Sequence, residues 1–221
     1  MDSIWINAPA KINIGLDVIR RREDGYHEVK MIMQSIRLFD RLTLTKTKEI
    51  KLTTNLSYLP VNEDNLVYQS AKRLMDEFHL EGGLDIKLDK RIPVAAGMAG
   101  GSTDAASCML AINDLYGLGL SKRHLMKRGV KLGADIPYCI LKGTALSEGI
   151  GEKLSTIPAM PSCYILIAKP NIHVSTKWVY TNLVLDEHTN HPDIDGMLAS
   201  MKKRDLLSLS NQIGNVLESV T

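Results

Sequence analysis

The sequence predicts an α+β fold, because predicted strands come in runs and the predicted helices are interleaved with them irregularly. A doubly wound parallel sheet would instead show strict alternation of strand and helix. The chain has 221 residues, of which 44% are hydrophobic and 24% charged, and these values are ordinary for a folded protein with a buried core. The length favours one or two domains.

The first part of the chain reads mainly as strands. Residues 3–8, 12–19, 29–38 and 41–47 read as strands, and apolar and polar residues alternate cleanly in the last of them, RLTLTKT. The polar stretch RRREDGYH separates the second strand from the third as a turn. A later strand at 84–91 carries Leu84, Ile86 and Leu88 on one face. The strands therefore gather in the N-terminal part of the chain.

Three helices are predicted before residue 140. The first spans 65–79 with Asn65 as its N-cap, and the second spans about 102–116 and ends at Gly117. The third spans 122–132, begins after the N-cap Ser121 and ends near Gly133. The following stretch YCILKGTALSEG reads as a β-hairpin.

The C-terminal part begins after a proline-containing span, LSTIPAMPS, which places a domain boundary near residue 158. The sequence thus predicts a domain of residues 1–158 and a second of residues 159–221. In the second, CYILIAKP is expected to form a strand, and helices are expected at about 175–184, 193–202 and 204–219.

The composition of the chain limits which partners and which cellular compartment are expected. A net charge of +2 and 5% aromatic residues argue against nucleic acid as the main partner. The three cysteines lie in apolar runs without metal-ligand spacing, so we expect buried free thiols at Cys108, Cys139 and Cys163. The N-terminus lacks the pattern of a signal peptide and no apolar run is long enough to span a membrane, so a cytoplasmic protein is expected.

The stretch IPVAAGMAGGSTDAA is rich in glycine and alanine and comes directly after a predicted strand. It lacks the lysine of a Walker A loop and does not fit the pattern G-x-G-x-x-G. Small residues before a helix leave backbone N–H groups accessible, which makes an anion site. The alternative is a tight turn in which Ser102 or Asp104 only caps the helix.

Three other stretches contain candidate functional residues. Lys11 lies in an otherwise apolar strand, APAKINIGL, and Asp135 lies in the apolar stretch GADIPYC. A partly buried carboxylate needs a partner, and Lys11 is a candidate, although the two could equally form a structural ion pair. The glycine-rich stretch GTALSEGIGEKL could line a substrate cleft or simply form a hairpin turn.

Taken together, these motifs resemble the GHMP kinase superfamily. The relevant stretches are PAKINIGLDV, EDGYHEV, IPVAAGMAGGSTDAA, GADIPYC and GIGEK, and the similarity runs along the whole chain. The Gly-Tyr-His trio at 25–27 is similar to kinases that act on 4-diphosphocytidyl-2-C-methyl-D-erythritol. The resemblance implies two domains, an N-terminal domain like ribosomal protein S5 and a C-terminal α+β sandwich.

The resemblance also implies a reaction: ATP-dependent phosphorylation of the substrate 2-hydroxyl group in non-mevalonate isoprenoid biosynthesis. Asp135 matches the catalytic base and Lys11 the catalytic lysine of the family. The substrate-binding residues would be Asn13, Tyr26, His27 and Tyr180. The ATP-binding residues would be Pro93, Val94, Ala95, Ala96, Gly97, Met98, Ala99, Gly100, Gly101, Ser102 and Thr103.

Mg²⁺ is expected with ATP. Ser102 or Thr103 could bind it, but no acidic residue stands out as its protein ligand, so the metal site stays open. The implied partner is the small-molecule substrate, with no membrane and no nucleic acid, and the implied assembly is a monomer or a homodimer. Ala99 and Thr103 depart from the Gly and Ser common in the family loop, and both replacements are small.

A larger departure concerns a third family motif, a glycine-serine loop of the G-S-G-P-T kind, which has no counterpart in 160–221. An incomplete C-terminal domain is therefore expected, and part of its apolar surface should remain exposed, at Ile165, Ile167, Leu206, Leu207, Ile213 and Val216. Two alternatives stay open. One is another GHMP-type kinase, such as a homoserine or mevalonate kinase, and the other is a truncated, non-catalytic nucleotide-binding protein.

Overall fold

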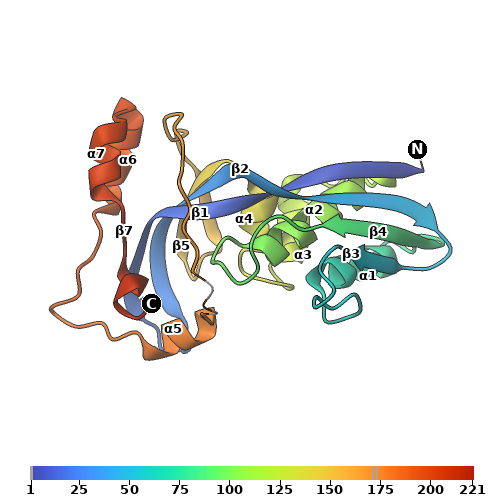
Figure 1. The fold of residues 1–221 in the computed structure, drawn as a ribbon, viewed down its shortest axis with the longest axis horizontal. Coiled ribbons are helices and arrows are strands. Elements are labelled where there is room, and N and C mark those ends of the chain that lie inside the picture. The colour runs from blue at the N-terminus through green and yellow to red at the C-terminus, as the bar shows by residue number, and fades with distance from the viewer. Residues whose placement is uncertain (1, 171, 173) are drawn as a thin grey trace. The chain divides into compact units, whose positions relative to one another are not determined.

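The computed structural model describes the chain except residues 1, 171 and 173 and the side chains of residues 176 and 177. The fold is mixed, with strands and helices (Figure 1). It divides into two compact units that each combine several stretches of chain. Unit 1 comprises Met1–Ala10, Ile36–Val94 and Met98–Leu141. Unit 2 comprises Lys11–Ser35, Ala95–Gly97 and Lys142–Thr221.

Two long strands, β1 (Ser3–Arg21) and β2 (His27–Thr47), contribute residues to both units. The sequence predicted each of them as two shorter strands. The predicted break in β2 falls beside Asp40, a residue that strands disfavour. The strand continues there because the Asp40 carboxylate accepts hydrogen bonds from backbone N–H groups of Arg91 and Ile92, at 2.5 Å and 2.8 Å.

Unit 1 contains part of the sheet, in the order β3-β4-β2-β1, and four helices. β4 (Gly83–Asp89) runs antiparallel to β2, and β3 (Lys51–Thr54) runs parallel to β4. The helices are α1 (Leu66–Glu77), α2 (Gly100–Leu115), α3 (Lys122–Gly129) and α4 (Ile136–Leu141). α2 packs against α1, α3 and α4, and ten of its residues are buried.

The predicted helix ends in unit 1 are largely confirmed. Asn65 accepts a hydrogen bond from Val67 N and Ser121 from His124 N, as N-caps do. Gly117 follows the C-cap of α2 with a φ of +61°, a conformation that glycine adopts without strain. Local signals were therefore sufficient at these positions.

The predicted hairpin at 138–149 is wrong in its first half, where residues 136–141 form α4 and only β5 (Thr144–Gly149) is a strand. Five of the six residues of α4 are buried, because the helix packs against α2 and α3. A continuous apolar run satisfies a buried helix as well as a buried strand, so periodicity alone cannot distinguish them.

Unit 2 contains the other part of the sheet, in the order β6-β5-β2-β1-β7. β5 and β6 (Lys153–Thr156) form an antiparallel hairpin, and β7 (Gly214–Asn215) runs parallel to β1. The helical segments are α5 (Thr176–Asn182), α6 (Ile194–Lys203), α7 (Leu206–Gln212) and a 3₁₀ turn at Val216–Ser219. The core of unit 2 joins strands to α6 and α7 through Ile14, Ile32, Ile194, Met197, Met201 and Leu209.

Two predictions in the C-terminal part are wrong. The stretch CYILIAKP forms no strand, and within it the side chains of Tyr164 and Leu166 are fully exposed. Apolar composition does not make a strand unless a neighbouring strand pairs with its backbone. The predicted helix at 204–219 is interrupted after Gln212, because Gly214 pairs with Gly15 of β1 in the short strand β7.

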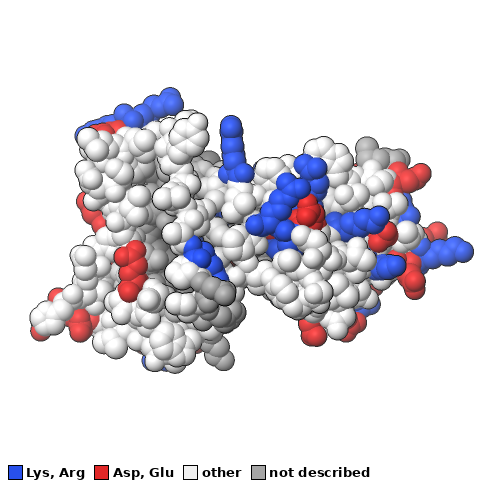
Figure 2. All heavy atoms as spheres, viewed as in Figure 1, with Lys and Arg blue, Asp and Glu red and all other residues white. Residues whose placement is uncertain are grey.

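The expected exposure of apolar residues is confirmed for most positions. Ile165, Ile167, Leu206, Leu207 and Ile213 are exposed, whereas Val216 is buried. Cys108 and Cys139 are buried free thiols as predicted, but Cys163 is exposed because its segment is not part of a sheet. None of the described helices is long and apolar enough to cross a membrane. On the face in Figure 2, basic side chains lie next to acidic ones, in keeping with the small net charge.

Candidate active site

The glycine-rich stretch forms an irregular loop that leads into α2. Ala95, Gly97 and Ala99 have positive φ values of 53°, 69° and 55°. Ala99 occupies the N-cap position, and no side chain caps the helix there. Because the first N–H groups of a helix have no partner within the helix, the start of α2 offers backbone donors and the positive end of the helix dipole. This is the geometry of an anion site.

The members of the loop differ in exposure. Met98 is buried and fixes the middle of the loop in the interior, and Thr103 is buried in α2. The half-buried members are Ala96, Ala99, Gly100 and Ser102. The exposed members are Pro93, Val94, Ala95, Gly97 and Gly101.

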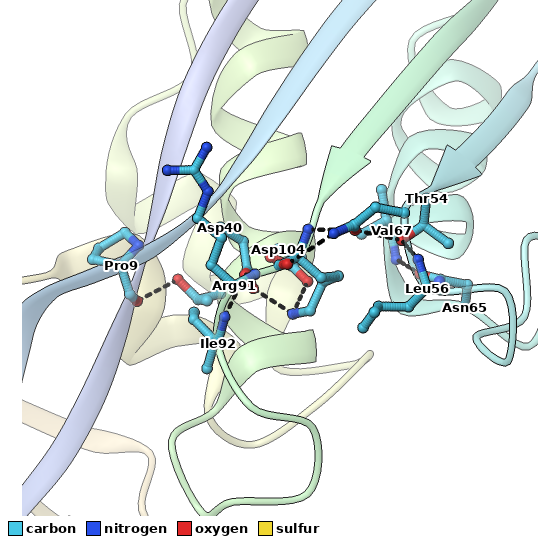
Figure 3. A network of polar contacts seen from close by, with 12 residues as sticks. Pro9, Asp40, Thr54, Leu56, Asn65, Val67, Arg91, Ile92 and Asp104 are labelled. Atoms are coloured by element: carbon cyan, nitrogen blue, oxygen red, sulfur yellow. Dashed lines mark hydrogen bonds and ion pairs between the residues drawn. The ribbon is translucent and has the colours of Figure 1, made fainter. Parts of the chain in front are cut away.

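The residues considered as helix caps lie inside α2 instead. The structure begins α2 at Gly100, two residues before the prediction. The Thr103 hydroxyl donates a hydrogen bond of 2.8 Å to the Pro9 carbonyl, and an Asp104 carboxylate oxygen lies 2.8 Å from Lys90 Nζ (Figure 3). No side chain caps α2 at its start, neither Ser102 nor Asp104, so the first backbone N–H groups of the helix have no capping side chain.

Asp135 lies in the loop between α3 and α4, immediately before α4, and is half-buried. Its carbonyl oxygen accepts a hydrogen bond from Cys139 N at 3.0 Å, which begins the helix. A Cβ atom at Gly133 would lie 4.0 Å from Ser102 Oγ. The structure therefore brings the Asp135 loop beside the start of α2, and the catalytic role of Asp135 stays a prediction.

Lys11 is buried in β1, and its Nζ donates a hydrogen bond of 3.2 Å to Asn13 Oδ1. Residues two apart in a strand point to the same face, so two predicted site residues are brought together. A buried ammonium group needs polar or anionic partners, which agrees with a role in binding. Lys11 belongs to unit 2 and Asp135 to unit 1, so the pairing of the two stays a prediction.

The predicted base-binding residues lie in unit 2. The rings of His27 and Tyr180 are 5.2 Å apart between centroids and tilted by 39°, although the two residues are far apart in sequence. Tyr26 is exposed in the neighbouring turn. Burial, and to a lesser degree the charge of Arg21, lower the pKa of His27. A neutral imidazole has one donor and one acceptor, which suits the edge of a nucleobase.

The turn that carries Tyr26 is held by short-range contacts. Arg22 and Asp24 form an ion pair at 2.8 Å, and Tyr26 N donates to Asp24 Oδ1 at 3.1 Å. Gly25 has a φ of +84°, which other residues adopt only with strain. These contacts present the Tyr26 ring outward.

Sequence reasoning missed Asp40 and Lys90, which are buried close to the loop. The available signal was a charged residue within or beside an apolar strand, in RLFDRL and LDKRIP. Such residues are rarely buried without a partner. Nothing in the sequence indicated that they would meet.

Comparison with known proteins gives a consistent result. Residues 65–143 match the family described as GHMP kinases N terminal domain. The chain is 56% identical to a 4-diphosphocytidyl-2-C-methyl-D-erythritol kinase of Lachnoclostridium phytofermentans, over 100% of this chain and 77% of that protein. It is 53% identical to the kinase of the same name from Lachnospira eligens, with the same coverage.

Solved structures agree. The crystal structure of a 4-(cytidine 5'-diphospho)-2C-methyl-D-erythritol kinase matches with a TM-score of 0.76 and 30% identity, over 98% of this chain and 76% of that one. Homoserine kinase from Cytophaga hutchinsonii, at 20% identity, 97% and 72% coverage and a TM-score of 0.69, shares the fold. The extent and identity of the matches lead to one conclusion: the chain belongs to the 4-diphosphocytidyl-2-C-methyl-D-erythritol kinase family of the GHMP kinases.

Proposed function

We propose that this chain transfers the γ-phosphoryl group of ATP to the 2-hydroxyl group of 4-diphosphocytidyl-2-C-methyl-D-erythritol. The observation that carries the proposal is 56% identity along the whole chain to a kinase of that name, together with an uncapped helix start behind a glycine-rich loop. In the reaction, the bond between the γ-phosphorus and the β–γ bridging oxygen breaks and a bond to the substrate oxygen forms. The proton of the hydroxyl group must be accepted by a base.

ATP would bind with its phosphates against the loop of residues 93–103. Backbone N–H groups and a helix dipole stabilise phosphate oxygens without a side chain that must first be ordered. The small side chains of the loop support this role, because they let the phosphates approach the backbone.

Asp135 is proposed to accept the hydroxyl proton. Its support is the match to the family motif and the position of its loop beside the start of α2. Lys11 is proposed to stabilise negative charge that develops during transfer, and Asn13, to which it is hydrogen-bonded, to contact the substrate.

The cytosine base of the substrate is proposed to bind in unit 2. Tyr26 would stack on the base, and neutral His27 would hydrogen-bond its edge, with Tyr180 as the second aromatic contact. The support is the short distance between the His27 and Tyr180 rings. These two rings form an aromatic surface beside which the ring of the substrate base could lie. By this assignment residues 159–221 contribute to substrate binding, and residues 1–158 bind ATP and carry the catalytic groups.

Mg²⁺ is proposed to enter with ATP. Among the residues that the structure describes, there is no group of three or more His, Cys, Asp or Glu side chains that could hold a metal ion. In keeping with this, we propose that Mg²⁺ takes ligands from phosphate oxygens and water, as it commonly does. We further propose that the enzyme acts in the cytoplasm, where ATP is available, as a monomer or a homodimer on small molecules only.

The test is an ADP-release assay of this chain with ATP and 4-diphosphocytidyl-2-C-methyl-D-erythritol, with homoserine and mevalonate as matched alternative acceptors. ³¹P NMR of the product identifies the new phosphate ester. ADP release that depends on the diphosphocytidyl substrate supports the proposal. Turnover only with another acceptor would contradict the substrate, and calorimetric ATP binding without any turnover would favour the non-catalytic alternative.

A further inference from the structure

Three charged side chains meet in the interior of unit 1, beside the glycine-rich loop (Figure 3). Lys90 Nζ lies 2.8 Å from a carboxylate oxygen of Asp104 and also donates to a carboxylate oxygen of Asp40. Their side chains are 4%, 2% and 0% exposed, respectively. Buried charges of this kind are costly unless they are paired, so their retention calls for an explanation.

The positions of the three residues relative to the loop are informative. Lys90 comes shortly before the loop, and Asp104 comes immediately after it. Asp40, from β2, accepts hydrogen bonds from the N–H groups of Arg91 and Ile92, at 2.5 Å and 2.8 Å. The cluster therefore contacts both ends of the loop. Before the loop, Asp40 binds the backbone N–H groups of Arg91 and Ile92, and after the loop, Lys90 binds the side chain of Asp104.

Further contacts fix the same two ends. The Asn55 side chain accepts a hydrogen bond from Lys90 N at 2.8 Å and donates one to the Lys90 carbonyl at 3.0 Å. Both backbone polar groups of Lys90, just before the loop, are thus fixed. A Cβ atom at Gly100 would lie 3.2 Å from Lys90 Nζ and 3.3 Å from Ile92 Cγ2. The start of α2 thus packs directly on the cluster, at a distance that a glycine permits.

The hydrogen bonds divide unequally between the two carboxyl groups. Asp40 accepts from three donors, namely Lys90 Nζ and the two backbone N–H groups, which suits an ionised carboxylate. Asp104 accepts from Lys90 through Oδ2, while its Oδ1 is buried and has no hydrogen-bond partner among the described residues. Two ionised carboxylates with one ammonium group would leave a net negative charge in the interior.

A proton on Asp104 would balance this charge. Burial is the largest cause that raises the pKa of Asp104 well above its usual value, and Asp40 adds to the effect while Lys90 opposes it. Burial alone would lower the pKa of Lys90, but Asp104 and Asp40 together raise it. Cys108 on α2 is another titratable neighbour of Asp104, and burial raises its pKa to about 12, so it is neutral.

We propose that Asp40, Lys90 and Asp104 form a loop anchor that holds both ends of the glycine-rich loop, so that its backbone N–H groups stay aimed at the ATP phosphates. Asp40 and Lys90 form the ion pair of the anchor, and Asp104 is the protonated partner. These are positioning residues that touch no reacting atom. A site built from backbone donors needs such support, because its geometry depends on the course of the chain rather than on side-chain rotamers. That ATP is the ligand rests on the proposed function.

The test compares the full chain with three variants, Asp40→Asn, Asp104→Asn and Asp104→Ala. Ile112→Ala is the matched control, because it removes a fully buried side chain of α2 that lies about two helical turns beyond Asp104. Hydrogen exchange of the free protein measures the amides of residues 94–103, and calorimetry measures affinity for ATP. Infrared difference spectra at neutral pH report the carbonyl band of a protonated buried carboxyl group.

In Asp40→Asn, we expect the loop amides to exchange about tenfold faster and ATP affinity to fall ~10–100-fold, because small displacements of a positioned site have large effects. Asp104→Asn, which resembles a protonated Asp, should keep loop exchange and ATP affinity near the wild-type values and lose the infrared band. Asp104→Ala should loosen the loop, whereas Ile112→Ala should change exchange in α2 without a selective effect on the loop.

Unchanged loop exchange in Asp40→Asn, or equal loosening in Asp104→Asn and Asp104→Ala, would overturn the proposal. If Asp40→Asn does not fold, the two Asp104 variants decide alone. If the wild-type chain binds no ATP, the proposed function fails, while hydrogen exchange in the free protein still decides whether the loop anchor exists.

Discussion

Two exposed turns carry most of the candidate ligand-binding residues, and they are held in different ways. The glycine-rich loop of residues 93–103 is flanked by a buried polar cluster, in which Lys90 contacts both Asp40 and Asp104. The turn that carries Tyr26 is held by the exposed pair of Arg22 and Asp24 and by a glycine with positive φ. One turn depends on long-range buried contacts, and the other on contacts between neighbours in sequence.

The difference follows from what each turn presents to its ligand. The glycine-rich loop presents backbone N–H groups, whose directions are correct only if the backbone is fixed. The other turn presents side chains, and Tyr26 and His27 can adjust their rotamers to a flat ring. A ligand site made of backbone therefore needs strong anchoring, whereas a site made of aromatic side chains needs only a correctly placed turn.

The largest expected effect concerns a residue outside both turns. Asp135→Asn should cut turnover by ~10²–10⁴-fold, the usual contribution of a positioned base, while ATP and substrate affinities stay nearly unchanged. Lys11→Met should act similarly, and the double variant should fall short of additivity because both residues serve one step. Steady-state kinetics beside calorimetry for each ligand provide the measurement. Full activity in Asp135→Asn would remove Asp135 from the mechanism.

The second prediction compares the anchoring of the two turns directly. Asp40→Asn should lower the free energy of unfolding of unit 1 by about 3–5 kcal/mol, because it removes the buried negative charge that Lys90 and the N–H groups of Arg91 and Ile92 share. Asp24→Asn should have little effect, because its partner and its carboxylate are both solvated. Urea unfolding followed by Trp5 fluorescence in a Trp178→Phe background reports unit 1, since Trp5 belongs to that unit. Equal losses in the two variants would mean that the buried cluster has no special role.

The third prediction concerns the turn that presents side chains. If Tyr26 stacks on the cytosine, Tyr26→Ala should weaken substrate binding by ~1–3 kcal/mol and leave ATP binding unchanged. Tyr26→Phe keeps the ring and should have a mild effect. Titration calorimetry with the diphosphocytidyl substrate and with ATP measures both affinities. Unchanged substrate affinity in Tyr26→Ala would make this turn an ordinary surface feature.

The smallest expected effect concerns how stability depends on pH. Asp104 and Asp24 should change the free energy of unfolding in opposite directions as the pH rises. The pKa of Asp104 is raised by burial, so the folded state keeps a proton that the unfolded state releases. Its contribution to stability is present below the usual pKa of an aspartate and is lost as the pH rises toward the raised value. In the wild type, the free energy of unfolding of unit 1 should fall as the pH rises above the usual pKa of an aspartate. In Asp104→Asn this fall should be smaller, because the side chain does not titrate.

Asp24 should behave in the opposite way. Its hydrogen bond with Arg22 lowers its pKa, so its contribution is present above the usual aspartate pKa and is lost as the pH falls through the lowered value. The effect should be slight and should weaken with salt, because the pair is exposed. Urea unfolding across pH, with Asp24→Asn and Asp104→Asn compared with wild type, measures both slopes. For each variant, the difference in the free energy of unfolding from wild type is plotted against pH. Slopes of the same sign for Asp24→Asn and Asp104→Asn would contradict the comparison.

The sequence by itself determined the features that depend on neighbouring residues. The caps Asn65 and Ser121, the stop at Gly117 and the α+β class were predictable, because short-range hydrogen bonds and the spacing of apolar residues specify them. The small residues of the loop already indicated an anion site. The assignments of Asp135 and Tyr26 came from family motifs, and their roles stay predictions.

Only the tertiary structure decided which distant residues meet. Asp40 and Lys90 are 50 residues apart in sequence, and no local pattern pairs them. The tertiary structure likewise decided that residues 136–141 form a helix, since α2 and α3 cover that apolar run, and that CYILIAKP remains exposed coil. In each case the result depended on which surface was available to bury a side chain or pair a backbone, and a linear pattern carries no information about that surface.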